Sequence, residues 1–329
     1  MQTTRRLILG AAAAALTLGL GPQAAHAQAD NYPNRPITVI IPFGAGSAST
    51  VVSRVMLDVM SQDLGQPIIV DNRPGAGGNA GTAQGLRAAP DGYTLIGGGS
   101  GPIAANATLF KNLGYDPIKD LEIISPYASF TIIVTASKKL GVNSVKELIA
   151  LAKKQPGKLH YGSVGIGSSQ HLAGEYFQQV AGVKLEHVPY KNIAQYGPDL
   201  IAGTVPLGFQ WYPNVAPSIE GKGAIPLAVA SDKRLDIVKN APTTAEAGLP
   251  DYKVNGWFAL VAPAGTPRPI LEKLNLSLNK ALKHPKVQKH FASQGAQAVG
   301  MGLDEAKKFQ IDELEKFRQI IEKAGIPQI

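Results

Sequence analysis

A strand, a glycine-rich turn and a helix follow one another between residues 37 and 65, and no other feature restricts the fold as much. The β-branched run Ile37–Ile41 predicts a buried strand. Apolar residues at three- and four-residue spacing then predict a helix with one buried face, which Gly65 ends. The N-terminus of such a helix carries unpaired N–H groups and the positive end of the helix dipole, so the turn can bind an anion. An ordinary capped turn is the simpler alternative for a single loop. The residues of the turn that we expect to contact a ligand are Phe43, Gly44, Ala45, Gly46, Ser47, Ser49 and Thr50.

A second copy of this design lies further along the chain. A predicted strand over 159–161 runs into the sequence Gly-Ser-Val-Gly-Ile-Gly-Ser-Ser at 162–169, and a helical pattern follows until Gly182. Ligands of open α/β sheets bind at the carboxyl ends of the strands. If the two loops belong to facing domains, two helix N-termini converge on one cleft, which suits a carboxylate held by N–H groups and hydroxyls. The expected contacts in this loop are Ser163, Gly167, Ser168 and Ser169.

Strands and helices alternate along most of the chain, which is typical of α/β folds with mostly parallel sheets and helices on both faces. The length of 329 residues allows two domains, each with its own core. We expect strands near 37–41, 67–70, 93–96, 131–135, 159–161, 185–188, 205–209, 225–230 and 257–261, and closing helices over 268–282, 285–293 and 303–324.

The first 27 residues have the form of an export signal. Arg5 and Arg6 precede an apolar run over 7–20, and Ala25-His26-Ala27 fits a cleavage site. The apolar run is short for a membrane span. Because the arginine pair also fits a loose twin-arginine signal, the export route stays open between that route and the general secretory one. We expect an exported, soluble mature chain.

The composition argues against several classes of function. The sequence contains no cysteine, which excludes disulfides, thiol catalysis and cysteine-ligated metals. The formal net charge is +8, but the basic residues are scattered, so we expect no nucleic-acid partner. The histidines lack zinc-protease spacing, no Gly-x-Ser-x-Gly elbow is present, and no Lys-Ser/Thr follows either glycine turn. The dinucleotide-like pattern at 75–80 lies too far from its strand. We therefore expect no metal, no cofactor and no catalytic residue.

Several sequence blocks carry a family resemblance. They are Pro-Phe with the glycine turn at 42–50, Asp-Asn-Arg-Pro-Gly-Ala-Gly-Gly-Asn at 71–79, Ala-Pro-Asp-Gly-Tyr-Thr-Leu at 89–95, Gly-Ser-Ser-Gln-His-Leu-Ala at 167–173, His-Val-Pro-Tyr-Lys at 187–191 and Ala-Pro-Ala-Gly-Thr-Pro at 262–267. This succession resembles the Bug (TctC-like) substrate-binding proteins of tripartite tricarboxylate transporters over essentially the whole mature chain. The resemblance implies a periplasmic protein with a two-domain, type II periplasmic-binding-protein-like fold and a hinged ligand cleft. It also implies that the two loops hold a ligand carboxylate, partly through ordered water, and that a large permease and a small membrane subunit are the partners.

The sequence departs from the family pattern where the family commonly has aspartate. Those positions are Thr50 and Gln210, and Trp211 follows. A carboxylate there would attract a ligand ammonium group, so its loss argues against an amino-acid ligand. Phe43, Trp211, Tyr196 and Trp257 can supply flat apolar walls, although core packing is the commoner role of such residues. We expect a small dicarboxylate or an aromatic carboxylate, with Ser100, Gln210 and Trp211 as further ligand contacts.

The expected domain boundaries follow from the same reading. Domain 1 comprises residues 28–127 and 253–300, domain 2 comprises 128–252, and the C-terminal helix within 301–329 packs back across domain 2. We expect a monomer that delivers a captured organic acid to a membrane transporter. A sensor that presents its ligand to a membrane receptor, and a secreted α/β enzyme, are the alternatives. The enzyme would need a nucleophile–base pair, which the sequence does not reveal.

Overall fold

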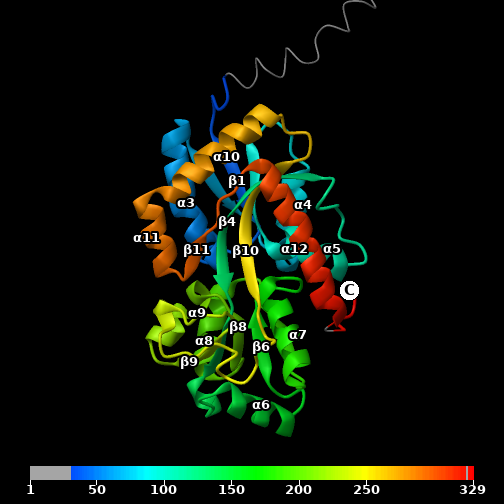
Figure 1. The fold of residues 1–329 in the computed structure, drawn as a ribbon, viewed down its shortest axis with the longest axis vertical. Coiled ribbons are helices and arrows are strands. Elements are labelled where there is room, and N and C mark those ends of the chain that lie inside the picture. The colour runs from blue at the N-terminus through cyan, green and yellow to red at the C-terminus, as the bar shows by residue number, and fades with distance from the viewer. Residues whose placement is uncertain (1–30, 324) are drawn as a thin grey trace, which may run out of the picture.

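The computed structural model describes residues 31–323 and 325–329, and the predicted export signal at 1–27 lies outside the described residues. The described chain forms two lobes, each built on one sheet, that follow one another along the long axis of the molecule (Figure 1). The segments between the lobes come from distant parts of the chain. The site therefore depends on how these lobes meet.

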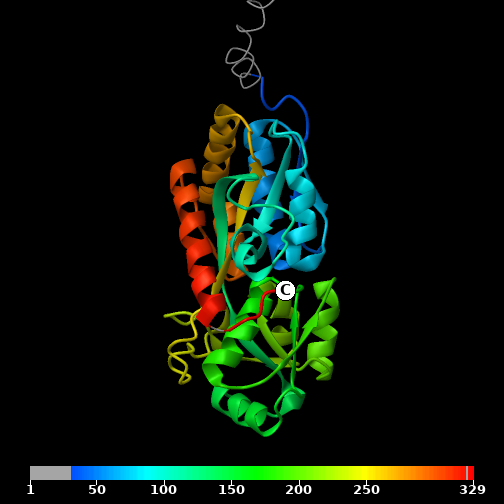
Figure 2. The same ribbon diagram turned by 90° about the vertical axis from the view of Figure 1, so that its right-hand side faces the viewer.

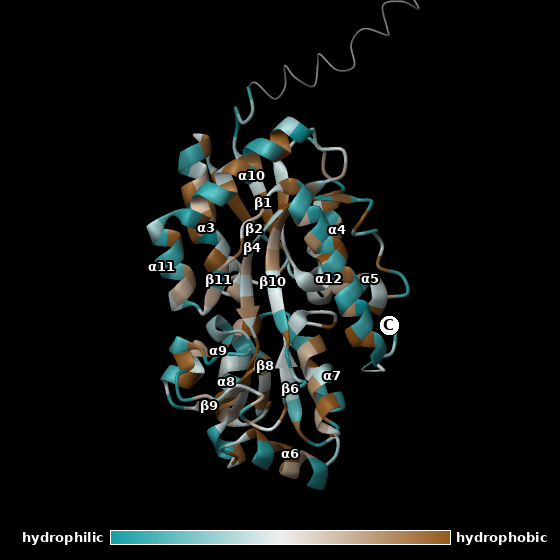
Figure 3. Cartoon of the chain, in the orientation of Figure 1, coloured by the Kyte–Doolittle hydropathy of each residue, from teal (hydrophilic) through white to brown (hydrophobic). Residues whose placement is uncertain are grey.

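The first lobe is built on a sheet with the strand order β11-β4-β10-β3-β1-β2. Its strands are β1 (Ile37–Ile41), β2 (Ile68–Asn72), β3 (Thr94–Gly99), β4 (Leu121–Thr131), β10 (Asn255–Pro263) and β11 (Ala296–Ala298). Its helices are α3 (Ala48–Leu64), α4 (Asn79–Leu86), α5 (Asn106–Leu109), α10 (Arg268–Lys283), α11 (Pro285–Ser293) and α12 (Leu303–Lys323). Most of these helices alternate hydrophobic and hydrophilic residues, as elements with one buried face do (Figure 3).

The second lobe is built on a sheet with the strand order β7-β6-β8-β5-β9. Its strands are β5 (Ile133–Ser137), β6 (His160–Ser163), β7 (Glu186–Pro189), β8 (Leu207–Gln210) and β9 (Ala224–Val229). Its helices are α6 (Val145–Lys154), α7 (Ser169–Ala181), α8 (Tyr196–Ala202) and α9 (Tyr212–Glu220). At the start of α6 the Ser144 hydroxyl accepts from the Glu147 N–H at 3.2 Å, which is one half of a capping box.

Two extended segments carry the chain between the lobes. The long strand β4 leads through Ile132 into β5, and the chain returns through Val254 into β10. The two segments lie side by side, since Thr131 pairs with Asn255 and the Ile132 N–H donates to the Val254 carbonyl at 3.4 Å. These two strands are the only covalent links between the lobes within the described chain, so they form the hinge region.

The sheets are mixed, and the expectation of mostly parallel sheets is wrong in this respect. Strand β1 pairs in parallel with β2 and β3, and β6 does so with β7 and β8. The returning strand β10, however, runs antiparallel between β3 and β4, and β5 runs antiparallel between β8 and β9. The crossing segments cause this, because a strand that enters a sheet from the other lobe runs against the strands that start within it.

Helix α12 also differs from the expectation that it packs back across the second domain. It lies along the first lobe and only its C-terminal end reaches the boundary between the lobes (Figure 2). Its Gln310 amide donates to the carbonyls of Ile103 and Pro117, and Phe317 and Ile321 join a core cluster with Ile103. Its one bond to the second lobe joins the Gln179 amide to the Lys323 carbonyl at 3.2 Å. The helical period predicts a buried face, but it does not identify the surface that covers that face.

Candidate ligand-binding site

The first glycine turn, between β1 and α3, leaves its helix N-terminus open. Ser47 occupies the N-cap position with an extended backbone, yet its hydroxyl caps no N–H among the described residues. It bonds instead to the hydroxyls of Ser49, at 3.0 Å, and Thr50, at 3.3 Å. The backbone N–H groups of Ser49 and Thr50 find no acceptor within 31–323 and 325–329. Four residues at a helix start normally need such acceptors, so this terminus has unused donors.

An asparagine from the other lobe supplies one acceptor. The Ala48 N–H donates to Oδ1 of Asn214, in the first turn of α9, at 3.1 Å. The Asn214 amide donates in turn to Oε1 of Gln210 at 2.9 Å, and Nε2 of Gln210 donates to the Gly162 carbonyl at 2.8 Å. This chain of bonds joins the first glycine turn to the second. Asn214 is not among the contacts predicted from the sequence, and its one sequence signal is the spacing of four residues after Gln210.

The second glycine turn, between β6 and α7, takes its cap from its own residues. The Ser168 hydroxyl caps α7 by accepting from the His171 N–H at 3.3 Å. The Gly167 N–H donates to Nδ1 of His171 at 3.3 Å. Below the turn, Nε2 of His187 lies 2.6 Å from Oγ of Ser163. The backbone N–H groups of Ser169 and Gln170, however, find no acceptor in the described chain, so this terminus too has unused donors.

The pair formed by Ser163 and His187 has the contact of a nucleophile and its base, but not the accessibility. Ser163 is fully buried, and its hydroxyl also accepts from the Gly165 N–H at 3.0 Å and donates to the Gly165 carbonyl at 3.2 Å. A nucleophile must reach a substrate. The serine therefore holds the turn in shape.

The two histidines beneath the second turn are neutral near pH 7. Their rings lie 4.4 Å apart, centroid to centroid. Burial lowers the pKa of His171 to about 4, and burial together with the neighbouring His171 lowers the pKa of His187 to about 3. The closest carboxylate is that of Glu175, 4.0 Å from Nε2 of His171, and it accepts a bond from the Tyr161 hydroxyl at 2.6 Å. The histidines thus act as uncharged supports of the turn.

The two lobes touch directly beside both turns. Oγ of Ser100, from the first lobe, lies 2.8 Å from Oγ of Ser169 in the first turn of α7. Gly77 packs so closely on the second turn that a β-carbon there would lie 2.0 Å from the Ile166 carbonyl oxygen. A β-carbon at Gly101 would lie 2.3 Å from the Gly167 carbonyl oxygen. These positions accept only glycine, and the lobes are closed on each other here.

A small cavity of about 10 Å³ lies between the lobes at the start of α3. Residues of both lobes line it, namely Phe43, Ser47, Ala48, Ser49, Val164, Gln170, Trp211, Asn214 and Phe258. The volume is about that needed for one water molecule. Trp211 is packed between Phe130 and Phe258, with ring centroids 5.2 and 4.8 Å away. Its indole N–H is buried and meets no acceptor among the described residues. Open donors of two kinds thus lie around one cavity.

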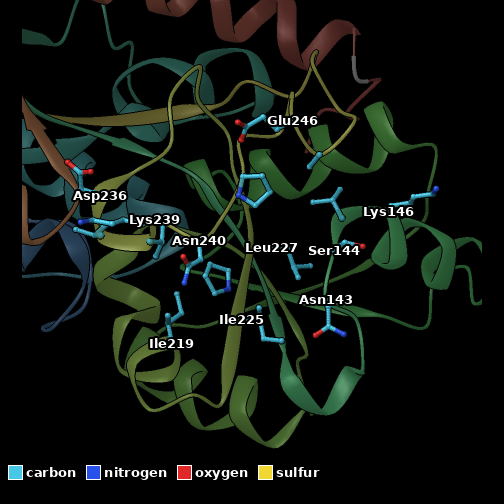
Figure 4. A pocket seen from close by; sticks show the side chains of 16 residues that line it. Asn143, Ser144, Lys146, Ile219, Ile225, Leu227, Asp236, Lys239, Asn240 and Glu246 are labelled. Carbon is cyan, nitrogen blue, oxygen red and sulfur yellow. The ribbon is translucent and has the colours of Figure 1, made fainter.

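A larger cavity of about 520 Å³ adjoins the small one, because Phe43 and Val164 line both. It also lies between the lobes, and its other walls come from the segments 74–77 and 189–193. A cavity of about 910 Å³, larger than these two, lies elsewhere: it is lined by Asn143, Lys146, Lys239, Asn240 and other residues of the second lobe (Figure 4). None of the ligand contacts expected from the sequence lines it. The space between the lobes is therefore the candidate site.

The predicted contact residues fall into two groups in the structure. Phe43, Gly44, Ser47, Ser49 and Trp211 line the two cavities between the lobes. The other predicted contacts line neither, and they are Ala45, Gly46, Thr50, Ser100, Ser163, Gly167, Ser168, Ser169 and Gln210. Two of the suggested aromatic walls are core residues: Trp257 donates to Glu313 at 2.7 Å and Tyr196 to the Leu207 carbonyl at 2.8 Å. In the described chain, no cluster of His, Asp and Glu is placed to hold a metal ion.

Comparison with known proteins identifies the family. A family model described as the tripartite tricarboxylate transporter family receptor, TctC, matches residues 52–326. BugT from Bordetella pertussis is 35% identical over 303 residues, which cover 92% of this chain and 93% of BugT. This chain belongs to the TctC receptor family. The Bug family resemblance is confirmed. Among the described helices of this receptor, none has the length and apolarity needed to cross a membrane.

Solved structures share the architecture of this receptor. BugD, described as a periplasmic binding protein, has a TM-score of 0.85 at 32% identity, with coverage of 90% of this chain and 99% of BugD. Rpa4515 from R. palustris, solved with adipate, has a TM-score of 0.87 at 32% identity, covering 91% and 100%. MatC from Rhodopseudomonas palustris, solved with bound malate, has a TM-score of 0.82 at 28% identity, covering 88% and 100%. The predicted periplasmic-binding-protein-like fold is confirmed, and this receptor belongs with periplasmic solute-binding proteins.

Proposed function

We propose that this receptor captures a small organic acid, a dicarboxylate or an aromatic carboxylate, in the periplasm and delivers it to the permease and small membrane subunit of a tripartite tricarboxylate transporter. A carboxylate of the ligand binds between the two glycine turns, at the small cavity. The observation that carries this proposal is the Trp211 indole N–H, which is buried beside the open N-terminus of α3 without an acceptor. Buried donors normally have partners, so an acceptor is missing from this place.

The electrostatics of the cavity favour an anion. The residues that line it include no charged side chain, so nothing repels a carboxylate and nothing pairs with an ammonium group. The N–H groups of Ser49 and Thr50 and the dipole of α3 add a positive potential. Thr50 and Gln210, which stand where the family commonly has aspartate, carry no charge. These features favour an acid over an amino acid.

The relatives support the same class of ligand. Rpa4515 was solved with adipate and MatC with malate, and both ligands are dicarboxylates. The present cavity has room for only about one water molecule, so a carboxylate must displace the Asn214 amide from Ala48 or part the lobes slightly. A ligand that contacts both lobes then favours the closed state by those contacts. Closure would be the signal that a membrane partner recognises.

The test uses the only two tryptophans of the chain as a matched pair. Trp211→Phe removes the N–H at the cavity, whereas Trp257→Phe removes one that bonds to Glu313 in the core. We expect adipate or benzoate, but not aspartate, to raise the melting temperature of the wild type. Hydrogen bonds to charged groups contribute about 1.5–3 kcal/mol, so Trp211→Phe should weaken acid binding by at least about tenfold. The smaller ring also leaves a void beside Phe130 and Phe258, so binding is compared by titration and not by melting temperature.

The control should behave in the opposite way. Trp257→Phe removes the bond to Oε2 of the buried Glu313, whose Oε1 keeps Lys316 at 2.9 Å, so it should lower the free energy of unfolding by about 1–3 kcal/mol and leave affinity unchanged. Because that variant keeps Trp211 as its one tryptophan, a fluorescence titration with adipate reports on the site itself. Failure of every organic acid to bind the wild type would refute the proposed function. Equal affinities of the wild type and Trp211→Phe for these acids would show that the ligand carboxylate binds elsewhere.

A further inference from the structure

The cavity of about 520 Å³ has a chemistry different from that of the small cavity beside it. Its walls are almost entirely apolar and include Pro42, Phe110, Ile166 and Ile193. Backbone of the glycine-rich segment 75–77 completes the wall on the side of the first lobe. The volume is in the range of sites for small ligands, whereas the small cavity has room for only about one water molecule. Of these two cavities between the described lobes, the larger one therefore has the space for the body of a ligand.

One charged side chain borders this apolar space. Lys191 is the single lining residue with a charged side chain, and it forms no salt bridge with any residue of the described chain. The neighbouring Tyr190 hydroxyl is occupied, since it donates to Asp199 at 2.6 Å. Asp199 does not line the cavity. Ile329 also lines the cavity, and its side chain is apolar. The lining thus carries one positively charged side chain, that of Lys191, and no carboxylate side chain.

We infer that this cavity holds the body and the far end of the ligand, an unsubstituted aliphatic chain or an aromatic ring that ends in a second carboxylate paired with Lys191. This inference rests on the proposed carboxylate site and deepens it. The first carboxylate binds at the start of α3, and the apolar body runs past Phe43 and Val164, which border both cavities. The second carboxylate then reaches the exposed ammonium group.

The apolar walls also determine what the site rejects. A hydroxyl or ammonium group on the ligand body would lose its water and find no partner on these walls, which costs binding energy. The site should therefore prefer apolar-bodied dicarboxylates to hydroxy acids of similar length and to amino acids. The pairing with Lys191 gives a second preference, for a dicarboxylate over the monocarboxylate of the same chain length. The monocarboxylate has the same body but lacks the second charge.

The experiment compares adipate with hexanoate, which differ by the second carboxylate, and succinate with malate, which differ by a hydroxyl. Affinities are measured calorimetrically for the wild type, Lys191→Gln and Lys191→Glu. An exposed ion pair is worth up to about fivefold in affinity, so adipate should bind the wild type about fivefold more tightly than hexanoate. Lys191→Gln should remove that advantage and leave hexanoate unchanged. Lys239→Gln, at the distant cavity of Figure 4, is the matched control and should change nothing.

The charge reversal gives a gain that misfolding cannot mimic. Lys191→Glu should bind adipate more weakly than it binds hexanoate. It should also bind 6-aminohexanoate, whose far end is an ammonium group, more tightly than the wild type does. Succinate should bind more tightly than malate to every variant. If acids bind but the adipate-to-hexanoate ratio is the same in all three proteins, the assignment of Lys191 is wrong while the proposed function stands. If malate binds best, the inference that the ligand has an apolar body is wrong. If no acid binds the wild type, the proposed function itself has failed.

Discussion

The two glycine turns have nearly the same sequence plan, yet the structure completes them in different ways. At the second turn, Ser168 caps α7 and His171 accepts from Gly167, so the partners lie within four residues of each other. At the first turn, Ser47 caps nothing within the described chain, and Ala48 takes its acceptor from Asn214 in the other lobe. One helix start is therefore capped by its own turn, and the other takes its acceptor from the other lobe, while each keeps two N–H groups without an acceptor in the described chain.

This difference concerns one donor at each turn. Both helices keep two N–H groups unpaired in the described chain, those of Ser49 and Thr50 in α3 and those of Ser169 and Gln170 in α7. Both helix N-termini thus supply a positive potential. The second turn also supplies a rigid surface, on which Gly77 and Gly101 pack without side chains. A ligand carboxylate at α3 would replace a contact that the receptor otherwise makes between its own lobes.

Acid should weaken the second turn first, and this is the largest effect that we expect. The folded pKa values of about 4 for His171 and about 3 for His187 lie below the unfolded value of 6.5. The unfolded chain therefore binds more protons below pH 6.5, and the stability present above that pH is lost as pH falls toward those folded values. Between pH 7 and pH 5 each histidine should remove about 2 kcal/mol from the free energy of unfolding, measured by urea denaturation.

A double variant provides the control for this pH effect. His171→Asn keeps an acceptor near the Gly167 N–H, and His187→Gln keeps a polar partner for the Ser163 hydroxyl, but neither group titrates. The variant should lose only a small part of that stability between pH 7 and pH 5. A wild-type protein with equal stability at both pH values would show that the histidines take up protons freely in the folded state. Within the described chain no histidine hydrogen bond reaches the first turn at 42–50, although His290 Nε2 lies 3.1 Å from the Val51 carbonyl oxygen in α3. The contacts of the first turn itself should therefore not contribute to the slope.

The local parts of the fold follow from the sequence, and the long-range parts do not. Strand β1 and helices α3, α7, α10 and α11 lie close to where periodicity and capping residues place them. Strand β4 was missed, because Ser-Pro at 125–126 interrupts its apolar pattern and reads as a break. The mixed order of the sheets and the position of α12 depend on which surfaces meet. Periodicity contains no information on that question.

The same holds for the site: its local features can be predicted from the sequence, and its long-range contacts cannot. Both glycine turns are visible in the sequence, since their strand, turn and helix are contiguous. Asn214 is not visible, because its role depends on a contact across 166 residues of sequence. Trp211 was predicted as a flat wall, but its unpaired N–H is a property of the packed structure. Ser163 is a hydroxyl residue of the kind expected to contact a ligand, but it is fully buried beneath the turn and lines neither cavity.

Asn214→Asp tests whether the acceptor at the first turn occupies the place of the ligand carboxylate. The aspartate would accept from Ala48 and carry a permanent negative charge at the start of α3, where the helix dipole stabilises it. A ligand carboxylate would then be repelled, and we expect acid affinity to fall by about tenfold, or about 1.4 kcal/mol. Calorimetric titration with adipate measures this. Asn240→Asp, an exposed change of the same kind at the distant cavity, should leave affinity intact, and equal losses in both variants would contradict the prediction.

The smallest effect concerns the two serines at corresponding positions, Ser168 and Ser47. Ser168→Ala removes a real helix cap, so it should lower the free energy of unfolding by about 1 kcal/mol. Ser47→Ala removes no cap, and a water molecule at the small cavity can replace its hydroxyl, so its cost should stay below about 0.5 kcal/mol. Urea unfolding of both variants at pH 7 makes the comparison. Equal costs would mean that the two turns are alike in solution, and that the open terminus of α3 is closed by contacts other than those of Asn214.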